Sequence, residues 1–159
     1  MADLGRSIPE PDSDVNEKLL FLRENMVHLT KQLSMPIIEV ALVVSKYIRI
    51  ILESLQRTAS EEGEKLPDFL LNPIPSKSDT TDSVIGISSF PLEKLIERVD
   101  QDRVDILDTL VRTVLNESQL EFASALQELR DWEFEIRSQL SEVSKPGGLF
   151  SPLLLGDEF

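Results

Sequence analysis

Residues 35–52 read Met-Pro-Ile-Ile-Glu-Val-Ala-Leu-Val-Val-Ser-Lys-Tyr-Ile-Arg-Ile-Ile-Leu, and this stretch decides the fold. Wound as an α-helix, it is apolar around most of its circumference and leaves only a narrow polar stripe. The broadest apolar face consists of Ile37, Val40, Ala41, Val44, Tyr47, Ile48 and Ile51. Such a helix has to be surrounded by protein or lipid, and this run is charged and shorter than the roughly 20 residues that span a bilayer. We therefore expect the central helix of a helical assembly, without membrane contact.

The chain before this stretch also has helical spacing. Its apolar positions alternate steps of four and three residues, at Val15, Leu19, Leu22, Met26, Leu29 and Leu33. The spacing slips between Leu33 and Ile37, where Pro36 would remove a backbone hydrogen bond from a continuous helix. We expect one long helix over residues 15–58, with either a kink or a short break at this point.

The second half of the chain is amphipathic as well. Apolar spacing predicts helical structure over residues 91–144, after a proline-rich connection over residues 59–90. Ser118 and Glu121 have the spacing of a capping box, so a second helix could start there, or one helix could continue through them. The fold class is therefore all-α, as a long kinked helical hairpin or a small antiparallel bundle.

Both ends of the chain lack this spacing. We expect residues 1–14 to form an extended arm, residues 15–145 the helical domain and residues 146–159 a docking tail. Large apolar side chains in the tail would favour aggregation if they stayed in water. The tail should therefore fold into a groove of its own bundle or dock on another subunit. Its candidate partner-binding residues are Leu149, Phe150, Leu153, Leu154, Leu155 and Phe159.

Composition argues against several functional classes. The 159 residues include no cysteine, which excludes disulfides, thiolate catalysis and cysteine-ligated zinc. A formal net charge of -13 argues against nucleic-acid binding, which requires clustered basic groups. Basic groups prevail over residues 15–57 and acidic groups over residues 91–145, so the two regions could attract each other within a chain or between chains. The first residues lack the pattern of a secretory signal, so we expect a cytoplasmic protein.

No group of side chains predicts a catalytic centre. His28 is the single histidine, and no recognisable nucleophile or acid accompanies it. The carboxylates from Asp100 to Asp108 lack the glycine and the late glutamate of a calcium loop, and arginines stand at helical spacing from them. We therefore expect no enzymatic activity, no metal and no cofactor.

The first long helix has more apolar surface than one returning helix could cover. Each large side chain contributes roughly 1.5–3 kcal/mol when buried, and a domain is stable by only about 5–15 kcal/mol. We therefore expect protein partners to complete the core, in a homo-oligomer or a hetero-complex. Besides the tail, the candidate partner-binding residues are Ile37, Val40, Val44, Tyr47, Ile51 and Trp132. The first functional hypothesis is a non-catalytic structural or adaptor subunit of a larger protein assembly, and the alternative is a small acidic chaperone or escort for a protein client.

Overall fold

The computed structural model describes residues 7–75, 97, 99–141, 150–156 and 159, and its regular secondary structure there is entirely helical. The helices are α1 (Val15–Gln32), α2 (Ile37–Glu61), α3 (Asp68–Leu71), α6 (Gln101–Ser118) and α7 (Phe122–Leu140). The all-α prediction is confirmed, in its small-bundle form. The helix start expected near Pro91 lies outside the described residues.

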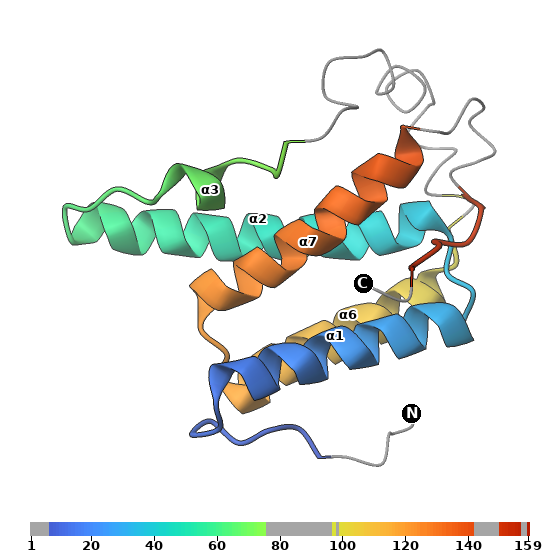
Figure 1. Cartoon of the computed structure of the whole chain (residues 1–159), viewed down its shortest axis with the longest axis horizontal. Coiled ribbons are helices and arrows are strands. Elements are labelled where there is room, and N and C mark those ends of the chain that lie inside the picture. The colour runs from blue at the N-terminus through green and yellow to red at the C-terminus, as the bar shows by residue number, and fades with distance from the viewer. Residues whose placement is uncertain (1–6, 76–96, 98, 142–149, 157–158) are drawn as a thin grey trace.

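Two antiparallel helix pairs build the bundle (Figure 1). Helices α1 and α2 run in opposite directions, and so do α6 and α7. Across the pairs, α2 packs on α7 and α6, while α1 packs on α6 and α7. The short helix α3 lies against α7. Each long helix therefore packs against helices from the other half of the chain.

The chain reverses direction at the break predicted near residue 36. Ser34 has a left-handed backbone (φ 47°), and the Met35 N–H donates to the Thr30 carbonyl at 3.0 Å. This arrangement ends α1 in a Schellman motif. Pro36 then precedes α2, where its missing N–H breaks no helical hydrogen bond. The kinked helix expected over residues 15–58 is thus two antiparallel helices with a short break between them.

A second left-handed residue separates α6 from α7. Gln119 has φ 51° and ends α6, so the structure selects the two-helix alternative for this region. The prediction of a capping box is wrong, because the Ser118 hydroxyl donates to the Val114 carbonyl (2.6 Å) instead of capping the start of α7. Glu121 precedes α7 without a side-chain cap.

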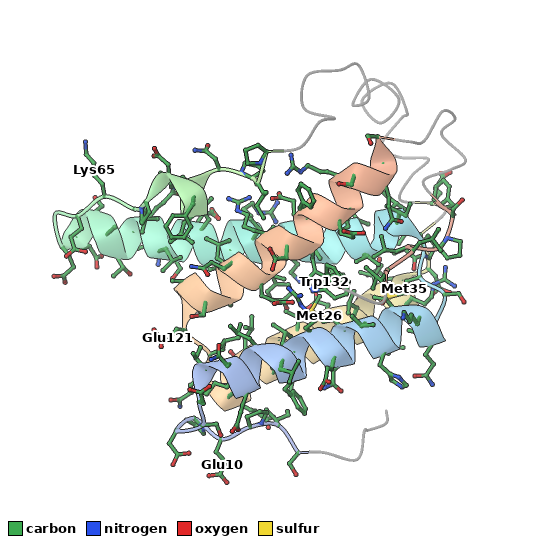
Figure 2. All side chains as sticks on the ribbon, in the orientation of Figure 1. Glu10, Met26, Met35, Lys65, Glu121 and Trp132 are labelled. Atoms are coloured by element: carbon green, nitrogen blue, oxygen red, sulfur yellow. The ribbon has the colours of Figure 1, made fainter. Side chains whose placement is uncertain are left out.

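The core lies between α2 and α7 on one side and α1 and α6 on the other. Figure 2 shows Trp132, Met26 and Met35 in this interior, whereas Glu10, Lys65 and Glu121 lie at the periphery. The first three side chains have no exposed surface. All five described helices contribute buried apolar residues to the core, and so does Leu153 near the end of the chain.

The apolar face of α2 is covered by this chain's own helices. The candidate partner-binding residues on it are at most 6% exposed, and these are Ile37, Val40, Val44, Tyr47 and Ile51. Their burial was expected, but its source was not: both α6 and α7 cover the face, so these residues and Trp132 need no second chain. The apolar surface of these six residues is covered within one chain and is therefore no ground for expecting an oligomer. Among the large apolar side chains of α2, Leu42 and Ile50 stay more than 40% exposed.

The described part of the amino-terminal arm is held against the bundle. Asp14 caps α1 by accepting from the Asn16 N–H (3.0 Å), and Ile8 packs on the core. The Lys18 ammonium donates to the Pro11 carbonyl at 2.7 Å. None of the described helices has the length and apolar character required to cross a bilayer.

Candidate functional site

The end of the chain folds back onto its own bundle. We use the word tail for residues 150–156 together with Phe159. The tail passes beside the turn between α1 and α2, and the chain ends between α7 and α1 (Figure 1). Of the two alternatives for this segment, docking within the same chain is the one observed.

Backbone hydrogen bonds join the first part of the tail to the α1–α2 turn. The Ile37 N–H donates to the Ser151 carbonyl (2.9 Å), and the Leu153 N–H donates to the Met35 carbonyl (3.0 Å). The two segments thus make an isolated antiparallel bridge. Helix α2 has no side-chain cap, so Ser151 provides an acceptor that the first turn of the helix would otherwise lack.

Gln139 of α7 holds the backbone of the next tail residue. The Leu154 N–H donates to Gln139 Oε1 (2.9 Å), and Gln139 Nε2 donates to the Leu154 carbonyl. The Leu154 side chain itself is 74% exposed, whereas Leu153 is 7% exposed and packs in the core. Neighbouring side chains therefore point to opposite sides, as they do in an extended strand.

Phe159 lies between an aromatic ring and a guanidinium group. Its ring meets the Trp132 ring edge-on, with centroids 4.8 Å apart and planes at 82°. The guanidinium carbon of Arg23 lies 4.7 Å from the centroid of the Phe159 ring. Arg23 Nη1 also donates to the Phe159 carbonyl at 3.4 Å. Edge-to-face stacking and a cation over a ring face are both attractive arrangements.

Two carboxylates of α7 fix the position of Arg23. Arg23 Nε and Nη2 donate to Glu128 at 2.7 and 3.0 Å, and Nη2 also donates to Asp131 at 2.8 Å. Glu128 accepts from Trp132 Nε1 as well (3.0 Å), so one buried carboxylate orients both Arg23 and Trp132 against Phe159. Burial lowers the pKa of Arg23, but the hydrogen bonds and charges of Glu128 and Asp131 outweigh it and raise that pKa above its ordinary value. The tail thus meets a permanent, pre-oriented cation.

Two hollows border the end of the tail. The hollow on the α7 side has a volume of about 390 Å³ and is lined by Asp131, Phe134 and Glu135. The hollow on the α1 side has a volume of about 480 Å³ and is lined by Leu20, Glu24, Val27, His28 and Lys31. Arg23, Gly156 and Phe159 line both. Gly156 and Phe159 therefore border open space on both the α1 side and the α7 side.

We call this whole site the tail groove. It consists of the turn at residues 35–37, Gln139, the cluster of Arg23, Glu128 and Trp132, and the two hollows. Its chemistry suits an extended peptide: backbone partners at one end, a buried position for a leucine-sized side chain, and a place for an aromatic ring at the other end.

Among the residues that contact the tail, Ile37 and Trp132 were candidate partner-binding residues from the sequence, whereas Arg23, Glu128 and Gln139 were not. Phe150 is half-buried against Ile38, and Leu155 is half-buried against the main core, while Leu149 lies outside the described residues. For Arg23 and Glu128 the signal was the excess of basic groups in the first region and of acidic groups in the second. For Gln139 there was no signal.

A separate polar cluster joins α2 to the start of α6. Glu39 has no exposed surface, and its carboxylate accepts two hydrogen bonds of 2.7 Å from Arg103. It also accepts from the Asp100 N–H at 3.0 Å. This pair runs against the expected charge asymmetry, because its acid is in the first region and its base in the second.

A second α2–α6 cluster follows the expected direction. Asp108 accepts from Lys46 and from the Tyr47 hydroxyl, the latter at 2.5 Å. Burial alone would raise the pKa of Asp108, but the hydrogen bonds from Lys46 and Tyr47 outweigh it and lower that pKa. Burial and the bond to Asp108 raise the pKa of Tyr47. In the described ranges, no three histidine or acidic side chains come together in a way that could hold a metal ion.

Comparison of the chain with known protein families, with curated proteins and with solved structures finds no match.

Proposed function

We propose that this protein is a non-catalytic adaptor subunit of a larger protein assembly, and that it engages a neighbouring protein through the tail and the tail groove. The observation that carries the proposal is the way in which the tail is held. An extended segment is bound by backbone hydrogen bonds to Met35, Ile37 and Gln139, and two side chains anchor it. Recognition domains bind linear segments of partner proteins with the same combination.

Exposed apolar groups beside the groove support the proposal. Leu154 on the tail is 74% exposed and Leu20 on α1 is 53% exposed, while Phe69 on α3, at 62%, is exposed elsewhere on the surface. A partner that contacts the tail or the groove would remove this surface from water. Burial of apolar area is the main source of affinity in such contacts.

The test is isolation of the full chain, with a small affinity handle, from its native source. We expect a partner protein in a fixed stoichiometric ratio with the chain, measured by mass spectrometry and by the mass of the intact complex. The variant Leu154→Ala should weaken this complex without changing the fold, because the Leu154 side chain is mostly exposed and its backbone bonds to Gln139 would remain.

Leu42→Ala is the matched control. Leu42 is also an exposed leucine, at 41%, but it lies on α2 outside the tail groove. Recovery of the chain as a lone species would contradict the adaptor proposal. Equal weakening by the two variants would contradict the role of the tail and its groove.

A further inference from the structure

We infer that the tail groove is a binding site for an extended peptide segment of another protein, and that the tail is its internal competitor. The inference rests on the proposed adaptor function and goes beyond it, because it names the class of ligand and a means of regulation. The ligand has an apolar aliphatic side chain and, six residues later, an aromatic ring.

The tail itself defines this ligand chemistry. Leu153 fills the buried position beside the α1–α2 turn, and Phe159 lies on Trp132 under the Arg23 guanidinium. Between them Gln139 pairs with backbone atoms only and so sets no requirement on the side chain at that position. The selective positions are therefore the two anchors, and the spacing between them follows from the sequence.

Open space also borders the described residues at the end of the tail. The hollows of about 390 and 480 Å³ flank Phe159 on both sides. Leu20 and Phe134 line these hollows, and Leu20 is 53% exposed. A ligand that covers Leu20 and Phe134 would remove this apolar surface from water, and so could bind more tightly than the tail does through Leu153 and Phe159.

Covalent attachment makes the tail an effective competitor. A segment joined to its site by a short connection has an effective concentration on the order of 1 mM. An external peptide with the sequence of the tail and a Kd of about 10–100 μM for the empty groove should therefore bind the intact chain about 10- to 100-fold more weakly than it binds a chain whose tail has been released. A partner replaces the tail when its peptide fits the groove better or is itself tethered nearby.

The groove contains a built-in reporter of tail position. Trp132 is the single tryptophan of the chain, and Phe159 lies against it. The chain has no cysteine, so Leu154→Cys introduces a unique labelling site at an exposed position. A dansyl group at this cysteine accepts energy from Trp132 while the tail is docked.

The first experiment adds an unlabelled synthetic peptide of residues 149–159 to the full chain that carries this label. We expect energy transfer from Trp132 to fall in a saturable way as the peptide replaces the tail. A peptide in which Leu153 and Phe159 are both replaced by alanine should have no effect at the same concentrations. An unchanged signal with the unmodified peptide, or an equal fall with both peptides, would overturn the inference.

The second experiment measures binding of the fluorescent 149–159 peptide to full-chain variants by polarisation. Phe159→Ala should release the internal tail and increase peptide affinity at least 10-fold, with Leu42→Ala, on α2 outside the tail groove, as the control that leaves affinity as in the parent chain. Circular dichroism checks that each variant is folded. If Phe159→Ala is folded and gains no affinity, the groove is not a peptide site. In that case a partner lost on Leu154→Ala in the native complex would still support the adaptor function, with the tail acting outward.

Discussion

The α2 face and the tail are the two regions in which the sequence placed partner-binding residues, and the structure buries them in different ways. The α2 face is enclosed by α6 and α7, each a long helix that contributes its own buried stripe. The tail lies in a groove at the surface, where Leu153 is buried and Leu154 is exposed. Removing the cover of α2 requires unfolding of the bundle, whereas removing the tail requires only local release. An apolar pattern therefore predicts that a segment is buried, but not whether that burial can be reversed.

The largest effect should follow from a change in the α2 face. Ile51→Ala removes a side chain that is 1% exposed, and we expect a loss of about 2–5 kcal/mol in the free energy of unfolding. The neighbouring Ile50 is 44% exposed, so Ile50→Ala should change stability by about 0.5 kcal/mol or less. Urea unfolding followed by circular dichroism measures both. Equal losses would mean that the α2 face is not enclosed as described.

A smaller loss should follow from the corresponding change in the tail. We expect Leu153→Ala to cost about 1–2 kcal/mol, because the tail can detach and so limits the loss to its own docking free energy. Leu154→Ala, one residue away, should be close to neutral in the same unfolding experiment. In addition, Leu153→Ala should speed amide exchange at Ile37, whose N–H donates to the tail, without speeding it at Val44. A loss as large as that of Ile51→Ala would show that the tail is an inseparable part of the core.

Acid pH should weaken the contact between α2 and α6 that Asp108 makes with Lys46 and Tyr47. The pKa of Asp108 is lower in the folded chain than in the unfolded chain, so its stabilising contribution is complete above about pH 4 and is lost as the pH falls below that value. Asp108→Asn should therefore lower the melting temperature at neutral pH, and the difference from the parent chain should shrink as the pH falls. The control is Asp105→Asn, which removes an exposed carboxylate from the same helix and should leave the melting temperature at neutral pH close to that of the parent chain. A difference that is constant with pH would contradict the described bonds to Lys46 and Tyr47.

The smallest effect should be a gain in stability from a change at Ser34, in the turn between α1 and α2 against which the tail is bonded. Ser34 has a left-handed backbone, where glycine is favoured, and α2 ends with a glycine of this kind at Gly63 (φ 72°). Ser34→Gly should raise the free energy of unfolding by about 0.5–1 kcal/mol. Energy transfer to the label at residue 154 should stay unchanged, because the substitution leaves the Met35 carbonyl available to the tail. A destabilised chain would show that the Ser34 side chain has a role of its own.

Much of the fold could be predicted from local pattern. The helical spacing of Leu22, Met26 and Leu29 identified the buried side of α1, and all three residues are buried. The slip in spacing at Pro36 located the interruption of the first helix, but left open whether it was a kink or a break. The return direction of α2 could not be predicted in the same way, because it depends on one left-handed residue, Ser34, that the spacing does not reveal.

The candidate site was predicted on the tail side and, on the receiving side, only at Ile37 and Trp132. Apolar residues after a Gly-Gly pair indicated a docking segment, and the structure places Leu153 and Phe159 at its two anchor points. The receiving residues Arg23, Glu128 and Gln139 are polar and belong to helices, so their sequence context is that of ordinary surface residues. Arg23 lies over the ring of Phe159 only because α1 packs beside α7.

The sequence by itself determined the helical class, the main apolar faces and the position of the break, because these depend on side-chain spacing and backbone preference within a few residues. The tertiary structure alone decided that α6 and α7 cover α2, and that the tail lies in its own groove. The physical reason is that hydrophobic burial has no direction: it requires that Val40 or Leu153 leave water, but any apolar surface of matching shape can satisfy it.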